Sequence, residues 1–291
     1  MKCNACPRKC NIDRDLVAGA CKCTNEIRAS KIMVHSWEEP CISGTRGSGA
    51  IFFSGCNLGC VYCQNKEISH TGNGKIISVQ ELADKMLELQ ARGVHNINLV
   101  TPTHFASQIR QALDLIQGKL VIPVVYNTSG YELEAEIEKM ASYVDVFLVD
   151  IKYFDSALSK KYSNASDYFE RAFSALGAML KAQPKCIFDE NGIMQRGVIL
   201  RHLVLPTMRK DSYKILDMVA NTYGTDSLRL SLMCQYTPEF CDENYKEIKR
   251  KITTFEYQSV LEHALELGFD GYMQDISSAN TIYTPNFKEK E

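Results

Sequence analysis

The sequence predicts an α/β fold, a partial (β/α)6 TIM-like barrel that carries a small Cys-rich N-terminal extension. From about residue 49 onward, short apolar runs alternate with amphipathic segments of helical spacing. Nearly continuous apolar runs are typical of parallel strands that are covered on both faces. Six strand–helix units occupy roughly 220 residues, fewer units than the eight of a closed barrel. We therefore expect an incomplete barrel.

The expected strands are the apolar runs themselves, bounded by turn residues. They cover residues 50–54, 96–100, 120–126, 144–151, 197–205 and 228–233. The expected helices have apolar residues three or four positions apart, as Leu82, Met86 and Leu89 are, and the first of them stops at Gly93. They cover residues 79–92, 104–117, 132–141, 165–181, 211–223 and 257–267.

Three regions differ in composition. Residues 1–45 are rich in cysteine and have no long apolar stretch, so we expect a metal-binding extension that is too short to bury a core of its own. Residues 46–285 are expected to form the barrel, and residues 286–291 a polar tail.

The charge pattern excludes some classes of partner. The 291 residues have a formal net charge of −2, and the basic residues are spread along the chain rather than striped. This argues against nucleic-acid or membrane-surface binding driven by charge. No run of 18 apolar residues occurs, and the N-terminal MKCNACPRKC contains no apolar signal region. We expect a cytoplasmic protein that binds neither nucleic acid nor a membrane.

Cysteine usage is the most informative feature of the composition. Of the 12 cysteines, nine precede residue 64, and closely spaced thiols in a reducing compartment more often bind metal than form disulfides. Cys56, Cys60 and Cys63 follow the first expected strand with x3 and x2 spacing. Three thiolates on one loop can hold a [4Fe–4S] cluster and leave one iron open, as catalysis requires. A structural zinc site would need a fourth ligand, for which His70 is the nearby candidate.

A second set of thiols lies in the extension. Cys3, Cys6, Cys10 and Cys21 form a four-thiolate set, with Cys23 as a substitute for Cys21. Four thiolates suit either structural zinc or a second Fe–S cluster, and the spacing does not decide between the two.

Polar residues gather where the expected strands end, the edge at which barrel enzymes place their chemistry. Asp150 and Lys152 lie on the same face of their strand by alternation, either as a functional pair or as a simple ion pair. Arg201 and His202 lie inside an apolar run, so at least one of them must point inward. The remaining candidates at these ends are Thr101, Thr103, His104, Asn127 and Thr128.

Several segments together resemble the radical S-adenosylmethionine (SAM) superfamily, in particular relatives of pyruvate formate-lyase activating enzyme. The similarity covers about residues 3–240. The segments are EEPCISG, FFSGCNLGCVYCQN, NINLVTPTHF, VYNTSGYE, VDVFLVDIKYFD, GVILRHLVLP and SLMCQYTP. The resemblance implies that SAM binds the open iron through its amino and carboxylate groups and is cleaved by one electron to a 5′-deoxyadenosyl radical. That radical would then abstract hydrogen from the substrate.

The resemblance also implies roles for the residues at the strand ends. It places Tyr62 near the adenine, Lys152 on the SAM carboxylate and Asp150 on the ribose or a cation. The segment that begins at Thr101 occupies the position of a glycine-rich turn that faces the SAM amino group, although the acidic residue of that turn is missing here. The segment that begins at Asn127 resembles a D-T-N-G turn, with Asn in place of Asp.

Two functional interpretations stay open at this stage. The resemblance implies a reducing partner such as flavodoxin or ferredoxin, and a glycyl radical enzyme or another protein as substrate. The Cys-rich extension is absent from short glycyl-radical activators. It indicates instead a maturase or small-molecule enzyme with an auxiliary cluster. A non-catalytic Fe–S or zinc protein is the alternative from a different class.

Overall fold

The computed structural model describes residues 2–274 and residue 287. Its main sheet has the strand order β10-β9-β8-β6-β5-β4-β2-β1-β3, and β7 pairs with β8 outside this path. Neighbours from β2 to β10 along the path are parallel, whereas β1 is antiparallel to β2 and β3 to β1. The strands are β1 Arg28–His35, β2 Ser48–Phe53, β3 Lys75–Ile76, β4 Ile97–Val100, β5 Val124–Thr128, β6 Val146–Asp150, β7 Ile187–Phe188, β8 Met194–Leu203, β9 Arg229–Met233 and β10 Gly271–Met273.

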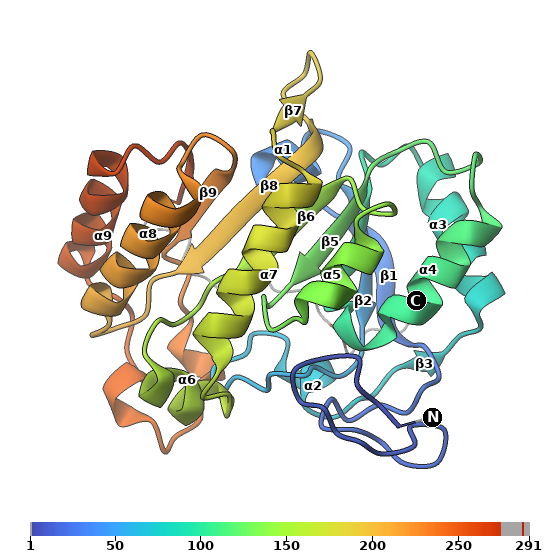
Figure 1. The fold of residues 1–291 in the computed structure, drawn as a ribbon, viewed down its shortest axis with the longest axis horizontal. Helices are drawn as coiled ribbons and strands as arrows, with labels where there is room; N and C mark the ends of the chain where they lie inside the picture. The colour runs from blue at the N-terminus through green and yellow to red at the C-terminus, as the bar shows by residue number, and fades with distance from the viewer. Residues whose placement is uncertain (1, 275–286, 288–291) are drawn as a thin grey trace.

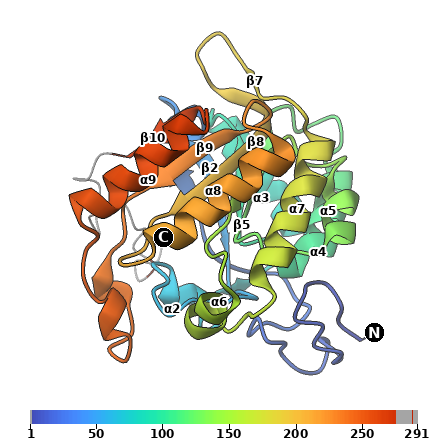
Figure 2. The same cartoon turned by 60° about the vertical axis from the view of Figure 1, so that its left-hand side comes forward.

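The longer helices α3, α4, α5, α7, α8 and α9 lie on the outer face of this curved sheet, as Figures 1 and 2 show. Along that face α3 contacts α4, α5 contacts α7 and α8 contacts α9. The helices are α1 Pro40–Ser43, α2 Lys66–Ser69, α3 Val79–Ala91, α4 Ala106–Leu115, α5 Glu134–Met140, α6 Ser156–Ser163, α7 Tyr168–Ala182, α8 Arg209–Tyr223 and α9 Thr254–Glu266. Among the described residues, no helix has the length and apolar character needed to cross a bilayer.

The predicted partial barrel is confirmed, because the sheet runs from an edge at β10 to an edge at β3 without closing. The six predicted strands correspond to β2, β4, β5, β6, β8 and β9. The strand predicted at residues 120–126 begins only at Val124, directly after Pro123, which has no backbone N–H to give to a ladder. The helix predicted at 104–117 begins with a 3₁₀ turn, Thr103–Phe105, before α4.

The sequence did not predict β1, which lies within residues 1–45. It pairs with β2 from Ala29 opposite Phe53 to His35 opposite Ser48, so this part of the expected extension belongs to the main sheet. Most of its residues are only partly buried. An antiparallel strand next to the edge of a sheet does not show the continuous apolar run of a central parallel strand. Residues 275–285 of the expected barrel and most of the expected tail lie outside the described residues. Phe287 packs edge-to-face on Phe52, with ring centroids 5.5 Å apart.

The carboxyl ends of the parallel strands meet the first 27 residues at one edge of the sheet. Figure 1 shows this N-terminal segment gathered beside α2 at that edge. The Cys56 N–H donates to Cys21 O at 3.2 Å, and the Ser54 N–H donates to the carbonyl oxygen of Arg28, the first residue of β1, at 2.8 Å. The loop that follows β2 is therefore held from the side of the extension.

Candidate active site

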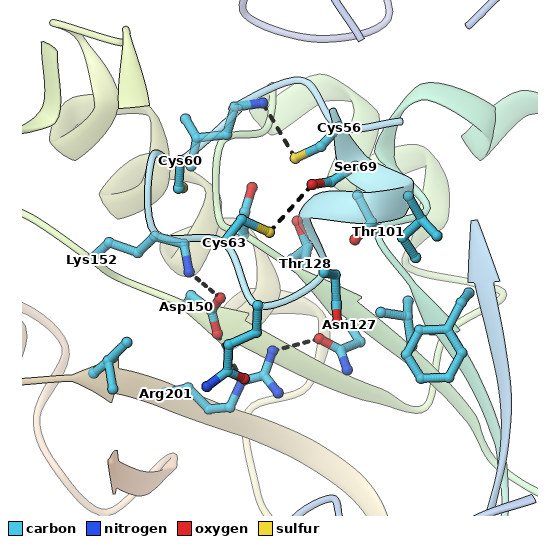
Figure 3. Close-up of a pocket in the computed structure, with 18 of the residues that line it drawn as sticks. Cys56, Cys60, Cys63, Ser69, Thr101, Asn127, Thr128, Asp150, Lys152 and Arg201 are labelled. Atoms are coloured by element: carbon cyan, nitrogen blue, oxygen red, sulfur yellow. Dashed lines mark hydrogen bonds and ion pairs between the residues drawn. The ribbon is translucent and has the colours of Figure 1, made fainter. Parts of the chain in front are cut away.

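A cavity of about 1340 Å³, counted to its open mouth, lies at the carboxyl ends of β2, β4, β5, β6 and β8. Cys56, Cys60 and Cys63 line one side of it, and polar side chains from the strand ends line the other, as Figure 3 shows. The sequence-predicted residues on its wall are Cys56, Cys60, Cys63, Tyr62, Thr101, Asn127, Thr128, Asp150, Lys152 and Arg201.

Two glycines shape the cysteine loop. Gly55 and Gly59 have φ angles of 78° and 76°, in the left-handed region that favours glycine. At Gly55 a side chain would also collide with the carbonyl oxygen of Cys21, since an added Cβ would stand 2.2 Å from that atom. The turn at Gly55 thus depends on close approach of the extension.

Each of the three loop sulfurs has a hydrogen-bond donor. Ser163 Oγ lies 3.0 Å from Cys60 Sγ, Ser69 Oγ lies 3.3 Å from Cys63 Sγ, and the Leu58 backbone N–H donates to Cys56 Sγ with an N···S distance of 3.4 Å. Donors aimed at sulfur suit thiolates that are bound to iron, whose electron density they stabilise.

Burial favours the neutral thiols in the absence of metal. It raises the pKa of Cys60 to about 12, and it raises the pKa of Cys63 as well. A coordinating metal deprotonates such a thiol outright. Among residues 2–274 and Phe287, no three His, Cys, Asp or Glu side chains are grouped as ligands of one metal ion. A [4Fe–4S] cluster takes each thiolate on a different iron, so this donor set fits a cluster.

A network of charged side chains faces the thiols across the cavity. Lys152 Nζ lies 2.6 Å from Asp150 Oδ2, and Arg201 Nε lies 2.7 Å from Asp150 Oδ1. Arg201 also reaches Glu38 at 3.3 Å and donates to Asn127 Oδ1 at 2.5 Å. Two cations and two carboxylates thus lie together at the ends of β5, β6 and β8, each less than a fifth exposed.

Asp150, Lys152 and Arg201 hold one another in the ionised state, whereas burial raises the pKa of Glu38. Burial alone would raise the pKa of Asp150, but the adjacent Arg201 and Lys152 outweigh it and hold that pKa below its usual value. Burial likewise opposes the charge of Lys152, yet Asp150 and the Cys60 sulfur raise the lysine pKa. Lys152 is therefore a protonated ammonium between Asp150 and the cysteine loop.

Two other predicted residues on the cavity wall have a backbone conformation or a contact that the sequence did not predict. Thr101 has φ 59°, an uncommon left-handed conformation for a β-branched residue, and its N–H donates to Asn127 O. Tyr62 lines the cavity, and its hydroxyl lies 2.6 Å from the hydroxyl of Tyr153.

Three predicted residues do not lie on the described wall of the cavity. Thr103 Oγ1 donates to Glu132 Oε1 at 2.5 Å. His104 is buried, which lowers its pKa to about 4, and its Nε2 lies 2.8 Å from Ser54 O. His202 has both ring nitrogens engaged, Nδ1 with Ile151 O at 2.7 Å and Nε2 with Ser212 Oγ at 2.8 Å. These contacts are those of buried structural side chains.

The extension brings its four predicted thiols into one neighbourhood. A Cβ on Gly19 would lie 3.5 Å from Cys10 Sγ and 3.6 Å from Cys21 Sγ, so both sulfurs flank that glycine. Burial raises the pKa of Cys21, and the nearby sulfurs of Cys10 and Cys3 raise it further. Burial also raises the pKa of Cys6 to about 12, with Cys21 adding to the shift.

Cys23, the substitute for Cys21 in the predicted set, is engaged elsewhere. Its thiol donates to Ser54 O at 3.2 Å. The grouping of the other four thiols therefore favours Cys21 as the fourth member.

Sequence reasoning missed Arg8 as a site residue. Its guanidinium donates to the carbonyls of Asn57 and Leu58, inside the cysteine loop, at 2.6 and 3.1 Å. It also donates to the carbonyls of Ser163, at 3.1 Å, and Asn164, at the end of α6. Every residue has a backbone carbonyl, so the sequence does not show which carbonyls accept from Arg8, and only the fold reveals these contacts.

Comparison with known sequences identifies the stretch that builds this cavity. A family model described as the radical SAM superfamily matches residues 50–193. The uncharacterised protein MJ0674 of Methanocaldococcus jannaschii is 28% identical over 278 residues, which cover 92% of this chain and 75% of that protein. The pyruvate formate-lyase-activating enzyme of Clostridium pasteurianum is 22% identical over 191 residues, 62% of this chain and 72% of that enzyme.

Solved structures share the fold. Streptococcus suis SuiB bound to S-adenosylmethionine has a TM-score of 0.52 at 12% identity, covering 76% of this chain and 48% of SuiB. SuiB bound to its precursor peptide SuiA has a TM-score of 0.51 at 14% identity, covering 77% of this chain and 48% of SuiB. The chain spans about half the length of SuiB, and at this identity the likeness concerns the fold alone. Residues 50–193, which carry the cysteine loop and the ends of β2, β4, β5 and β6, thus form a domain of the radical SAM superfamily, whose members use a [4Fe–4S] cluster and SAM.

Proposed function

We propose that this protein cleaves SAM reductively at a [4Fe–4S] cluster on Cys56, Cys60 and Cys63 and abstracts a hydrogen atom from a protein or peptide substrate. The observation that carries the proposal is the cavity itself, where three thiols with hydrogen-bond donors face a protonated lysine held by Asp150. When bound, the cluster supplies an open iron for SAM and the electron that splits its sulfonium into methionine and a 5′-deoxyadenosyl radical.

The side chains around the cavity would bind and orient SAM. The Lys152 ammonium is positioned to pair with the SAM carboxylate, because Asp150 fixes it beside the cysteine loop. Asn127 has its side-chain oxygen held by Arg201, which leaves its orientation fixed at the cavity wall. Tyr62 offers a ring face or edge for the adenine. Together these contacts keep the reacting atoms in one geometry and reduce the volume open to water.

One of the relatives supports a class of substrate. Similarity to a pyruvate formate-lyase-activating enzyme supports a backbone glycine of a glycyl radical enzyme as the hydrogen donor. In that reaction the nucleoside radical takes one hydrogen atom to become 5′-deoxyadenosine, and the glycine is left as a carbon radical. A flavodoxin or ferredoxin would supply the electron. Incubation with reduced protein, SAM and pyruvate formate-lyase should then produce a glycyl radical signal by electron paramagnetic resonance (EPR).

SAM cleavage is tested by product analysis. Anaerobically reconstituted protein with dithionite and SAM should release 5′-deoxyadenosine and methionine in equal amounts. The Cys56/Cys60/Cys63→Ala variant should release neither, whereas Cys186→Ala, directly before β7 and not among the residues that line the cavity, should behave as the wild type. Absence of product from the wild type, or its persistence in the triple variant, overturns the proposal.

A second candidate is a maturase or small-molecule enzyme with an additional metal centre. The sulfurs of Cys10 and Cys21 beside Gly19, with Cys3 and Cys6 in electrostatic contact with Cys21, support it. Metal analysis of the Cys56/Cys60/Cys63→Ala variant distinguishes the two kinds of metal that this additional centre could bind. Residual iron and sulfide would indicate a second Fe–S cluster, and zinc without iron a structural zinc site.

A further inference from the structure

Ser163 ends α6 and makes the shortest of the three contacts to the loop sulfurs. It is 1% exposed, and its Oγ lies 3.0 Å from Cys60 Sγ and 2.9 Å from Tyr153 OH. The Tyr153 hydroxyl in turn lies 2.6 Å from the Tyr62 hydroxyl. An unbroken chain of hydrogen bonds therefore runs from Tyr62, on the cavity wall, to a predicted cluster ligand.

The direction of these hydrogen bonds, from Tyr62 to Cys60, follows from the chemistry of the Cys60 sulfur. A thiolate bound to iron can only accept, so Ser163 must donate its single hydroxyl proton to Cys60. Ser163 Oγ then accepts from Tyr153, and Tyr153 accepts from Tyr62. Each tyrosine hydroxyl has one proton to donate, so this order gives every bond in the chain one donor and one acceptor. Donors aligned in one direction polarise one another and strengthen the last bond.

The end of α6 is held firmly against the cysteine loop. Val61 N donates to Tyr162 O at 2.9 Å, and Arg8 donates to the carbonyls of Ser163 and Asn164. At the other end of the helix, the Asp155 side chain accepts from the N–H groups of Ala157 and Leu158. The Ser163 hydroxyl therefore has a fixed position relative to Cys60.

The other two loop sulfurs have weaker support among the described residues. Cys63 accepts from Ser69 at 3.3 Å and Cys56 from the Leu58 N–H at 3.4 Å, both longer than the Ser163 contact. Both of those cysteines are also less buried than Cys60. The strongest donor thus acts on the most buried sulfur.

We propose that Ser163 is a positioning residue which, with Tyr153 and Tyr62 behind it, raises the reduction potential of the cluster. The inference rests on the cluster of the proposed function. Reduction adds negative charge to the cluster, and a hydrogen bond to a ligating sulfur stabilises that charge. Ser163 would therefore make the one-electron reduction that precedes SAM cleavage easier.

The test is a redox titration of the cluster, followed by EPR, in the reconstituted protein without SAM. Ser163→Ala should move the midpoint to a more negative potential. At a potential poised at the wild-type midpoint, the ratio of reduced to oxidised cluster should fall several-fold, because only the difference in hydrogen-bond strength between the two oxidation states is lost, a fraction of the whole bond. Ser163→Thr keeps the hydroxyl and should restore the midpoint. Tyr153→Phe should shift it in the same direction by less.

Ser159→Ala is the matched control, because Ser159 lies in the same helix, is 1% exposed and donates to Ser156 O instead of a sulfur. It should leave the midpoint unchanged. A wild-type midpoint in a Ser163→Ala protein of full iron content overturns the inference. If Ser163→Ala fails to bind iron, the midpoint of Tyr153→Phe tests the inference instead. A wild-type midpoint in Tyr153→Phe then overturns the inference. Failure of the proposed function would look different, since the midpoints would still shift while no variant released 5′-deoxyadenosine.

Discussion

The Arg8 guanidinium donates to the backbone carbonyl of Asn57 across 2.6 Å, and so joins the N-terminal extension to the loop between Cys56 and Cys60. Together with the Cys56 N–H bond to Cys21 O, this contact makes the extension a support of the cysteine loop rather than a separate appendage.

Arg8→Ala should therefore reduce the iron bound per chain after reconstitution, because the loop loses hydrogen bonds that fix its backbone. Arg8→Lys should bind an intermediate amount, since a lysine cannot reach several carbonyls at once. The measurement is iron and sulfide content at equal protein concentration. Lys9→Ala, an exposed neighbour in the same turn, should bind as the wild type does. Equal iron content in all four proteins would refute this role of Arg8.

Asp150→Asn should weaken SAM binding, because it removes the carboxylate that fixes Lys152 and leaves the lysine free to move. We expect a dissociation constant raised about tenfold, equivalent to ~1.4 kcal/mol. Lys152→Met should have at least as large an effect, whereas Lys160→Met, exposed on α6, should have none. Anaerobic equilibrium binding of SAM to the oxidised cluster protein measures this. An unchanged affinity of Lys152→Met for SAM would show that Lys152 does not bind SAM.

Glu132 should make stability depend on pH. Burial raises its pKa from 4.5 to about 7, despite hydrogen bonds from Thr103 and Thr128. The folded state therefore binds more protons than the unfolded state between these values, and stability falls as the pH rises through this window. The loss is on the order of 2–3 kcal/mol.

Glu132→Gln does not titrate and should lack this loss. Its melting temperature relative to wild type should rise between pH 5 and pH 8. Glu138→Gln, exposed on α5, should follow the wild type at both pH values. A Glu132→Gln protein whose difference from wild type is the same at pH 5 and pH 8 would show that Glu132 ionises normally.

His202→Ala should destabilise the protein and leave SAM binding intact. Both ring nitrogens have buried partners, Ile151 O and Ser212 Oγ, so the substitution removes two hydrogen bonds and leaves a cavity. We expect a loss of about 2 kcal/mol or more. Thermal unfolding and SAM affinity are to be measured on the same preparation. A weakened SAM affinity in a folded variant would show that His202 takes part in SAM binding.

The parts of the site predicted from sequence are those with a local signature. The cysteine spacing on one loop and the polar residues that end apolar strands can be recognised without knowing the fold. Arg201 and His202 show the limit of this reasoning, because both lie in one apolar strand and only the fold decides that Arg201 faces the cavity.

The rest of the site depends on contacts between distant segments. Arg8 donates hydrogen bonds to backbone carbonyls far along the chain, and Ser163 donates one to Cys60, 103 positions away in the sequence. The helix that carries Ser163, SALSKKYS, has little apolar periodicity and was not predicted. Thr103 has the residue type of a ligand-binding group, yet its hydroxyl satisfies the buried Glu132.

The most direct test of the central claim is the EPR spectrum of the dithionite-reduced protein, recorded with and without SAM. If SAM binds the open iron of a cluster on Cys56, Cys60 and Cys63, its addition should change the g-values of the [4Fe–4S]⁺ signal. The Cys56/Cys60/Cys63→Ala variant should show no SAM-dependent change. A wild-type signal with the same g-values in the presence and absence of saturating SAM would contradict the account.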